Sequence, residues 1–198
     1  MARLILASGS PRRAELLRQI GAAFEVQVSE TEEQQTGTPR VLTCANARAK
    51  AEAVARRFPG RAVLGADTVV ALGDQVYGKP GTEDAARAML RALAGRSHRV
   101  TTGLAIVNAR GEVFEAYAET EVVFAPLTDA EIAAYVATGE PLDKAGSYAI
   151  QGRAAAFIEA VHGSFSSVVG LPLATFVALA RKAGVDIYDD HGEGPAGR

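Results

Sequence analysis

The chain has 198 residues, of which 48% are hydrophobic and 22% charged, and its formal net charge is −2. This balance excludes a broad basic surface for nucleic acid, and the single cysteine, Cys44, excludes an intramolecular disulfide and a cysteine-rich zinc site. The longest apolar run, within residues 171–180, is about half of the roughly 20 residues that a membrane span needs.

Strand and helix signals alternate in the first part of the chain. Ser10 followed by Pro11 is typical of a helix start, and Gly21 of a helix end. The predicted order is a buried strand at residues 3–7, a helix at 11–20, a strand at 24–28, a polar loop at 29–39, a helix at 39–58 and an apolar strand at 62–72. This alternation favours a sheet with helices packed on it.

The second part of the chain combines capped helices with hairpin signals. Thr82, followed by two acidic residues, caps a helix that Gly95 ends, and a capping box at Thr128 and Glu131 starts another. The predicted order is a short strand at 76–77, a helix from 83, strands at 99–107 and 113–124, a helix at 129–137, a hairpin of strands at 155–161 and 165–169, and a helix at 172–183.

Together these signals predict an α/β fold built on one mixed, elongated sheet flanked by helices. Neither an internal repeat nor a linker divides the chain, so we expect a single domain over residues 1–185, followed by a polar tail at 186–198. Binding sites in such folds favour strand ends and the loops that leave them.

Residues 8–13 combine two hydroxyls with two guanidiniums between a strand and a helix start. Ser8 and Ser10 supply the hydroxyls, and Arg12 and Arg13 supply the charges. The first backbone N–H groups of a helix are also unpaired, so the segment suits an anion, phosphate above all. The alternative is a capped helix with two solvated arginines.

Asp67 is a carboxylate inside an otherwise apolar strand. An unpaired charge there is costly, so the residue needs a charged partner, a metal or a cleft. The alternative is an aspartate at a strand end that bonds to a turn. Because apolar residues flank Asp67 on both sides, we favour a functional role.

The segment from Gly73 to Lys79 has the spacing of a Walker A phosphate-binding loop, but its surroundings do not fit one. Pro80 stands where a Ser or Thr would hold Mg²⁺, and residues 76–77 are predicted as strand. The following helix also starts only after Thr82. We therefore do not expect a P-loop ATPase, and we expect Lys79 to contact phosphate only as a point charge.

Four further features carry weaker signals. The acidic loop around Glu33 offers the oxygen ligands that a hard cation prefers, although a solvated loop is the simpler interpretation. Residues 143–152 carry amide, hydroxyl and aromatic groups that suit the edge of a nucleobase. Lys50, taken alone, is interpreted as a surface lysine of the long helix, and Cys44 as a packing residue of the same helix.

Six segments together resemble the Maf family of nucleoside triphosphate pyrophosphatases. They are LASGSPRR at residues 6–13, GADTVV at 65–70, GKP at 78–80, HRVTTG at 98–103, DKAGSYAIQG at 143–152 and VVGLP at 168–172. The segments follow the family order, and only the tail after about residue 183 is not covered. One such segment alone would be weak, but six in order are specific.

The resemblance implies a fold like that of the inosine-triphosphate pyrophosphatases, with an elongated mixed sheet in two lobes and a central cleft. It implies hydrolysis of a nucleoside triphosphate to the monophosphate and pyrophosphate with a divalent metal cation, Mg²⁺ or Mn²⁺. By the same resemblance, Asp67 accepts a proton, and Glu33 and Asp67 are linked to the metal. Whether Asp67 acts as the base or as a metal ligand stays open. The residues implied to surround the triphosphate are Ser8, Arg12, Arg13, Lys50 and Lys79.

Three positions place the chain within a subgroup of the family that it resembles. Maf proteins that act on dTTP and UTP carry Arg, Thr and Gln at the positions of Arg12, Thr68 and Gln151, whereas relatives that act on 7-methyl-GTP carry Trp, Gln and Glu. This chain has the first set. The amide of Gln151 donates and accepts, as the O4/N3–H edge of a pyrimidine requires. The expected substrates are therefore dTTP and UTP, normal or modified.

A non-catalytic nucleotide-binding regulator of cell division is the alternative from another class. Such a sensor has no need of a base, so Asp67 together with Lys79 and Glu33 favours catalysis. The lone cysteine and the short apolar start lead us to expect a cytoplasmic protein that binds a nucleoside triphosphate and neither nucleic acid nor membrane. The near-neutral charge and the predicted hairpins allow a homodimer.

Overall fold

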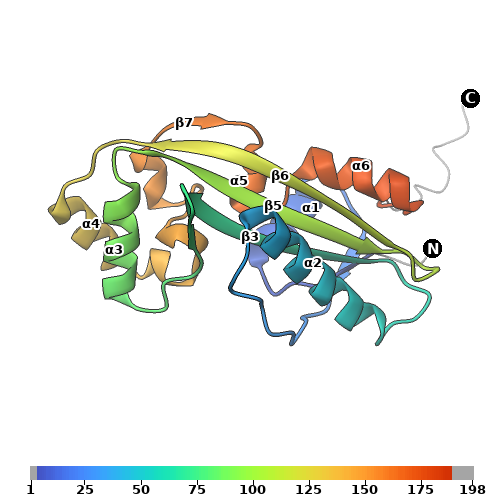
Figure 1. Cartoon of the computed structure of the whole chain (residues 1–198). Coiled ribbons are helices and arrows are strands. Elements are labelled where there is room, and N and C mark those ends of the chain that lie inside the picture. The colour runs from blue at the N-terminus through green and yellow to red at the C-terminus, as the bar shows by residue number, and fades with distance from the viewer. Residues whose placement is uncertain (1–3, 189–198) are drawn as a thin grey trace, which may run out of the picture.

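The computed structural model describes residues 4–188 and contains a seven-stranded mixed sheet flanked by helices (Figure 1). The strands are β1 (Leu4–Leu6), β2 (Phe24–Val26), β3 (Val63–Leu72), β4 (Gln75–Tyr77), β5 (Ser97–Val107), β6 (Val113–Phe124) and β7 (Ile158–His162). The α-helices are α1 (Pro11–Gln19), α2 (Pro39–Ala55), α3 (Glu83–Leu93), α4 (Asp129–Val136), α5 (Phe165–Val169) and α6 (Leu173–Ala183). Three short 3₁₀ segments are η1 (Glu140–Asp143), η2 (Ala145–Ser147) and η3 (Arg153–Phe157). The predicted mixed α/β sheet is confirmed.

The sheet has the strand order β2-β1-β3-β5-β6-β7, with β4 paired to β3 beside it. β1 runs parallel to both β2 and β3, and the remaining pairs are antiparallel. The chain packs back beside β2 as far as Tyr188, which forms a bridge with Ala22. Of the tail predicted at 186–198, residues 189–198 lie outside the described part of the chain.

Helices gather at the two ends of the sheet (Figure 1). Helices α3 and α4 lie at one end, α1, α2 and α6 lie at the other, and the long strands β5 and β6 run through both groups. Alternate residues of β3 belong to two separate cores, because successive side chains of a strand point to opposite faces. Val63 packs in the smaller core with α2, whereas Leu64 and Ala66 pack in the larger one.

One edge of β3 is open in its middle. β1 pairs with β3 at Val63 and Leu64, and β4 pairs with it from Val70 to Leu72. Between these pairings, none of the described strands covers residues 65–69 on that side, while β5 pairs with them on the other. The loops that follow β1 and β4 therefore border the same gap, and residues of β3 that point to either face can line it.

Two glycines allow α2 to lie very close to the sheet. A Cβ atom added at Gly65 would lie 2.1 Å from the carbonyl oxygen of Ala47, and one added at Gly103 would lie 2.5 Å from the carbonyl carbon of Thr43. Real Cβ atoms do not approach backbone atoms this closely, so neither position accepts a side chain without a shift of the helix. Gly103 is also the register partner of Asp67, so this close packing occurs beside the buried carboxylate.

The hairpin predicted for residues 155–161 and 165–169 is wrong. Only its first half contains a strand, which begins at Ile158, and the second half is the helix α5. Ser164 starts that helix, since its Oγ accepts a hydrogen bond of 3.2 Å from the N–H of Ser167. A run of five residues is too short for its apolar pattern to distinguish a strand from a helix. The Ser164 cap is the local feature that favours the helix.

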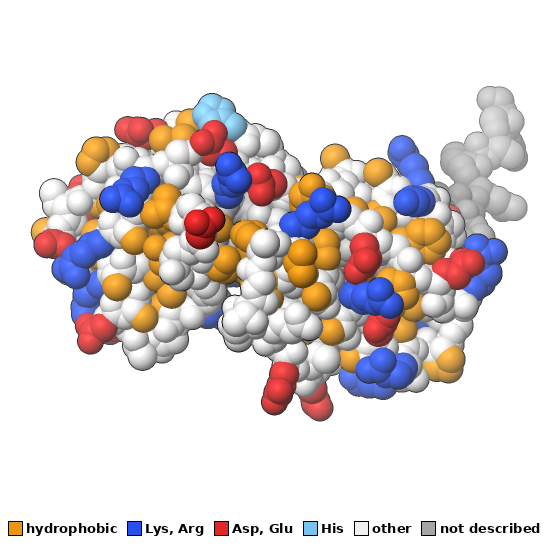
Figure 2. Space-filling model, in the orientation of Figure 1, with side chains coloured by type: hydrophobic (Ala, Val, Ile, Leu, Met, Phe, Trp, Pro, Cys, Tyr) orange, Lys and Arg blue, Asp and Glu red, His pale blue; other side chains and the backbone are white. Residues whose placement is uncertain are grey.

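Lysine and arginine side chains alternate with acidic ones over the face shown in Figure 2, as the small net charge leads one to expect. Within residues 4–188, none of the helices combines the length and the apolar character that crossing a bilayer requires.

His98 is predicted to make stability depend on pH. Its ring is buried against Phe124 and Tyr148, with Nε2 2.8 Å from the Tyr148 hydroxyl, and burial lowers the pKa of His98 to about 4. The unfolded chain, with a His pKa near 6.5, takes up this proton first. His98 therefore leaves the free energy of unfolding unchanged above about pH 6.5 and lowers it by about 3 kcal/mol as the pH decreases to 4.

Urea unfolding between pH 7 and pH 5 measures this effect. The His98→Gln variant should lose the part of the pH slope due to one proton, whereas His162→Gln, at an exposed position, should keep it. Identical slopes in the native protein and in His98→Gln would contradict the assignment.

Candidate active site

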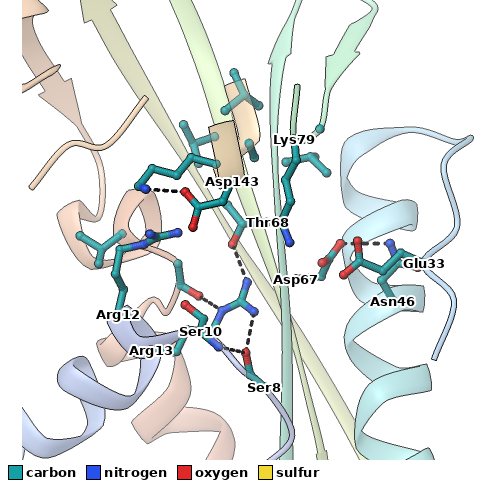
Figure 3. A pocket seen from close by; sticks show the side chains of 18 of the residues that line it. Ser8, Ser10, Arg12, Arg13, Glu33, Asn46, Asp67, Thr68, Lys79 and Asp143 are labelled. Carbon is teal, nitrogen blue, oxygen red and sulfur yellow. Dashed lines mark hydrogen bonds and ion pairs between the residues drawn. The ribbon is translucent and has the colours of Figure 1, made fainter. Parts of the chain in front are cut away.

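A cavity of about 610 Å³ lies at the open edge of β3 (Figure 3). Its walls come from the loops after β1 and β4, from α1 and α2, and from the segment between η1 and η3. The residues that the sequence predicts for the site all line this cavity: Ser8, Arg12, Arg13, Glu33, Lys50, Asp67, Thr68, Lys79 and Gln151. Elements from both ends of the sheet thus contribute residues to one pocket.

The start of α1 leaves its backbone donors available to a ligand. Ser10 occupies the N-cap position and Pro11 the first helical position, as predicted, but the Ser10 side chain makes no capping hydrogen bond. The N–H of Ser10 instead donates to Ser8 Oγ at 3.2 Å. Since the first N–H groups of a helix have no partner within the helix, this end of α1 favours an anion in the cavity.

Arg13 is held from three directions by neutral acceptors. Its Nε donates to the carbonyl oxygen of Gly170 at 2.8 Å, Nη1 to Ser8 Oγ at 3.1 Å and Nη2 to Thr68 Oγ1 at 3.2 Å. A guanidinium has five N–H donors, so one remains on each terminal nitrogen. Burial lowers the pKa of Arg13, and the charge of Asp67 opposes this. The result is an oriented positive charge with two free donors.

A chain of hydroxyls fixes the direction of the Thr68 hydrogen bond. Thr102 Oγ1 donates its only hydrogen to the carbonyl oxygen of Ser167 at 2.9 Å. Thr68 Oγ1 lies 2.9 Å from Thr102 Oγ1, so the Thr68 hydroxyl must be the donor of that pair. With its hydrogen used there and one lone pair facing Arg13, Thr68 can offer a ligand only an acceptor.

Asp67 is buried and receives a hydrogen bond at each oxygen. Lys50 Nζ lies 2.7 Å from Oδ1, and Asn46 Nδ2 lies 3.0 Å from Oδ2. Both donors come from the face of α2 that Gly65 and Gly103 allow to approach the sheet. The two bonds hold the carboxylate in one orientation at the wall of the cavity.

Glu33 joins the acidic loop to the same lysine. Its Oε1 lies 2.6 Å from Lys50 Nζ, so two carboxylates converge on one ammonium. Partial burial acts to raise the pKa of Glu33, but the hydrogen bond and charge of Lys50, with the charges of Lys79 and Arg13, lower it overall. Glu33 is therefore ionised at neutral pH.

Three cationic side chains of the cavity form no ion pair with any acidic residue that the structure describes. They are Arg12, Arg13 and Lys79, and Figure 3 shows Lys79 pointing toward the space between Asp67 and Arg13. Arg12 lies on the side of Asp143, which pairs with Lys144 at 2.6 Å. Positive charges without acidic partners in one pocket indicate an anionic ligand with several charges.

The cavity lining also includes apolar side chains and the amide of Gln151. Val69, Val70, Tyr148 and Ile150 are among its lining residues, and Gln151 itself is exposed. Apolar side chains together with an amide suit a nucleobase, whose faces are apolar and whose edge forms hydrogen bonds.

Reasoning from the residues alone gave the wrong environment for Lys50 and missed Asn46. Lys50 is not on the surface but 9% exposed, because it lies on the side of α2 that faces β3. Asn46 contacts both Asp67 and the backbone of Gln34, so it ties the acidic loop to the carboxylate. The four-residue spacing of Asn46 and Lys50, which puts both on one helix face, was the available signal.

The structure confirms the reasons against a Walker A loop. Residues Gln75–Tyr77 form the strand β4, and the next helix begins only at Glu83. Lys79 nevertheless lines the cavity, at the end of β4.

Comparison with known proteins gives matches over nearly the whole chain. A family model described as "Maf-like protein" matches residues 3–183. A protein named dTTP/UTP pyrophosphatase from Anaeromyxobacter dehalogenans is 54% identical over 187 residues, which are 92% of this chain and 94% of that protein. Its namesake from Symbiobacterium thermophilum is 50% identical over 190 residues, 95% and 97% of the two chains.

Among solved structures, a HAM1 protein from Coxiella burnetii is similar with a TM-score of 0.49 and 18% sequence identity. The match covers 78% of this chain and 91% of that one.

Proposed function

This chain belongs to the family of Maf-like proteins, and on that premise we propose that it hydrolyses dTTP and UTP to the monophosphate and pyrophosphate. Relatives about half identical to it, matched over more than nine-tenths of both chains, carry that activity in their names. The proposal therefore concerns both the reaction and the base that is preferred.

The observation that carries the proposal is the charge pattern of the cavity. Arg12, Arg13 and Lys79 line it without an acidic partner among the described residues, and the buried Asp67 lies in the same pocket. A triphosphate supplies the negative charges that these cations lack. The free N–H donors of Arg13 and of the start of α1 suit its oxygens.

The reaction requires an attacking water and a stabilised leaving group. The water oxygen bonds to the α-phosphorus, the bond from that phosphorus to the bridging oxygen breaks, and pyrophosphate leaves with the bonding electrons. Asp67, held in one orientation by Lys50 and Asn46, orients the water and takes its proton. Arg13 and Lys79 stabilise the charge that develops on pyrophosphate.

The donor set fits a divalent cation of the Mg²⁺ class. Glu33 and Asp67 are carboxylates that already converge on one positive group, Lys50, and hard cations prefer such oxygens together with those of a phosphate. Among the described residues, no three His, Cys, Asp or Glu side chains gather, so the substrate would complete the ligand set. When bound, the cation neutralises phosphate charge and acts as a Lewis acid.

Product analysis tests the proposed reaction. The purified protein is incubated with Mg²⁺ or Mn²⁺ and with dTTP, UTP, CTP or GTP, and both pyrophosphate and orthophosphate are measured. We expect pyrophosphate from dTTP and UTP. Release of orthophosphate would point to a different phosphatase, and binding without turnover would support a nucleotide sensor.

Exchange of the three subgroup residues is expected to change the substrate ranking. The variant Arg12→Trp, Thr68→Gln, Gln151→Glu should lose about tenfold or more in kcat/KM for dTTP relative to 7-methyl-GTP, because a carboxylate at position 151 only accepts hydrogen bonds, whereas the native amide also donates them. Steady-state kinetics with both nucleotides measures the ratio.

The double variant Arg12→Trp, Gln151→Glu is the matched control for Thr68, whose hydroxyl holds Arg13. It should shift the ranking in the same direction while keeping more of the overall rate. An unchanged ranking in both variants would place base recognition elsewhere.

A further inference from the structure

The backbone on both sides of Gln151 is held by two side chains that do not line the cavity. The N–H of Ala149 donates to the Tyr135 hydroxyl at 3.1 Å. The N–H of Arg153 donates to the two carboxylate oxygens of Glu140, at 3.0 and 3.2 Å. Neither Tyr135 nor Glu140 is part of the cavity wall. Gln151 thus lies midway between two fixed backbone positions.

Tyr135 and Glu140 are themselves joined. The Tyr135 hydroxyl donates to Glu140 Oε1 at 2.8 Å. The same hydroxyl accepts from the N–H of Ala149, so the two side chains that hold the backbone are linked by a hydrogen bond. The Tyr135 ring is 3% exposed and packs edge-on against Phe157, with ring centroids 5.2 Å apart. Burial and the Glu140 hydrogen bond raise the pKa of Tyr135, so the hydroxyl keeps its proton.

The segment between the anchors has little freedom. The N–H of Gly152 donates to the carbonyl oxygen of Ala149 at 2.9 Å, which closes a turn around Gln151. A Cβ atom at Gly152 would lie 2.3 Å from Glu140 Oε1, so the backbone passes directly over the carboxylate. A shift of Tyr135 or Glu140 would therefore move the peptide that presents the Gln151 amide.

We infer that Tyr135 and Glu140 are positioning residues that set base selectivity by fixing the backbone of the Gln151 turn. This inference rests on the proposed function, since it assumes that Gln151 contacts the base. The pair touches neither substrate nor metal, and it acts through two backbone N–H groups. Loss of the pair lowers discrimination between bases more than it lowers the rate of the chemical step.

Kinetic discrimination tests the inference. For the native protein and for Tyr135→Phe, kcat/KM is measured with dTTP, UTP, CTP and GTP. We expect the ratio of the best to the worst substrate to fall about tenfold in Tyr135→Phe, mainly through KM, since a lost buried hydrogen bond has about that effect. Tyr117→Phe, which removes the same hydroxyl at an exposed position of β6, should keep the ratio.

Two variants of Glu140 separate positioning from general damage. Glu140→Gln keeps an oxygen that accepts from Arg153 and should preserve the ratio within about twofold, whereas Glu140→Ala should lower it as Tyr135→Phe does. If Glu140→Ala does not fold, the comparison of Tyr135→Phe with Tyr117→Phe still decides. A drop by the same factor for every substrate would show a purely structural role and overturn the inference.

A double-mutant cycle shows whether the effect runs through Gln151. In the Gln151→Ala background, Tyr135→Phe should cause no further loss of discrimination, because the side chain that the turn presents is absent. Independent, additive losses would overturn the inference. If the native protein releases no pyrophosphate from any nucleotide, the proposed function fails first; if it is active and selective but Tyr135→Phe is unchanged, only this inference fails.

Discussion

Replacing Asp67 by asparagine is expected to lower kcat for dTTP by about 10³-fold. Asparagine keeps the size of the side chain and one acceptor oxygen, but it loses the charge that takes the proton of water in the proposed reaction. Lys50 keeps Glu33 as its partner at 2.6 Å, so the pocket should stay assembled. Release of pyrophosphate measures turnover, and calorimetry with a non-hydrolysable dTTP analogue should show binding within a few-fold of native.

The matched control for this substitution is Asp74→Asn, in the exposed turn between β3 and β4. It should retain full activity. The unfolding temperature of both variants shows whether the fold is kept. Activity of Asp67→Asn within twofold of native would remove Asp67 from the chemistry.

Replacing Arg13 by lysine is expected to lower kcat/KM by about 10²-fold, although the charge is kept. The guanidinium donates three N–H groups to Gly170, Ser8 and Thr68, and two N–H groups of this cavity-lining side chain stay free. An ammonium has only three donors, so it cannot make those bonds and also contact phosphate. Steady-state kinetics with dTTP measures the loss, which should appear in kcat if the free donors meet the leaving pyrophosphate.

Arg18→Lys is the control, since Arg18 lies on the same helix and is exposed. It should behave as the native protein does. Equal kinetics of the two lysine variants would show that Arg13 only supports the fold.

Local signals predicted the elements whose ends are fixed by their own residues. The capping box at Thr128 and Glu131 forms both of its hydrogen bonds, and Thr82 accepts the N–H of Ala85 at the start of α3. The helix α5 was predicted as a strand because its five residues carry no clear period, and only the cap at Ser164 distinguishes it. Short elements are decided by single hydrogen bonds that a pattern does not show.

The candidate site was partly predictable from its residues. The hydroxyls and guanidiniums of residues 8–13 and the cost of a buried Asp67 were visible in the sequence, because each lies within one short segment. The role of Lys50 required the resemblance to a family, since 17 positions separate it from Asp67 and only the packing of α2 brings them to 2.7 Å. Asn46 was missed for the same reason, as were the two anchors of the Gln151 turn.

The narrow space between α2 and the sheet has a consequence for mapping the site by mutagenesis. Lys50 and Asn46 reach Asp67 because Gly65 and Gly103 have no Cβ atom. Alanine scanning truncates side chains, so it probes what a residue contributes and leaves glycines out of the survey. Here the informative change is the addition of one methyl group at Gly65 or Gly103. It would move Lys50 away from Asp67 without altering either side chain. Two positions without functional groups thus determine how closely Lys50 and Asn46 can approach the carboxylate.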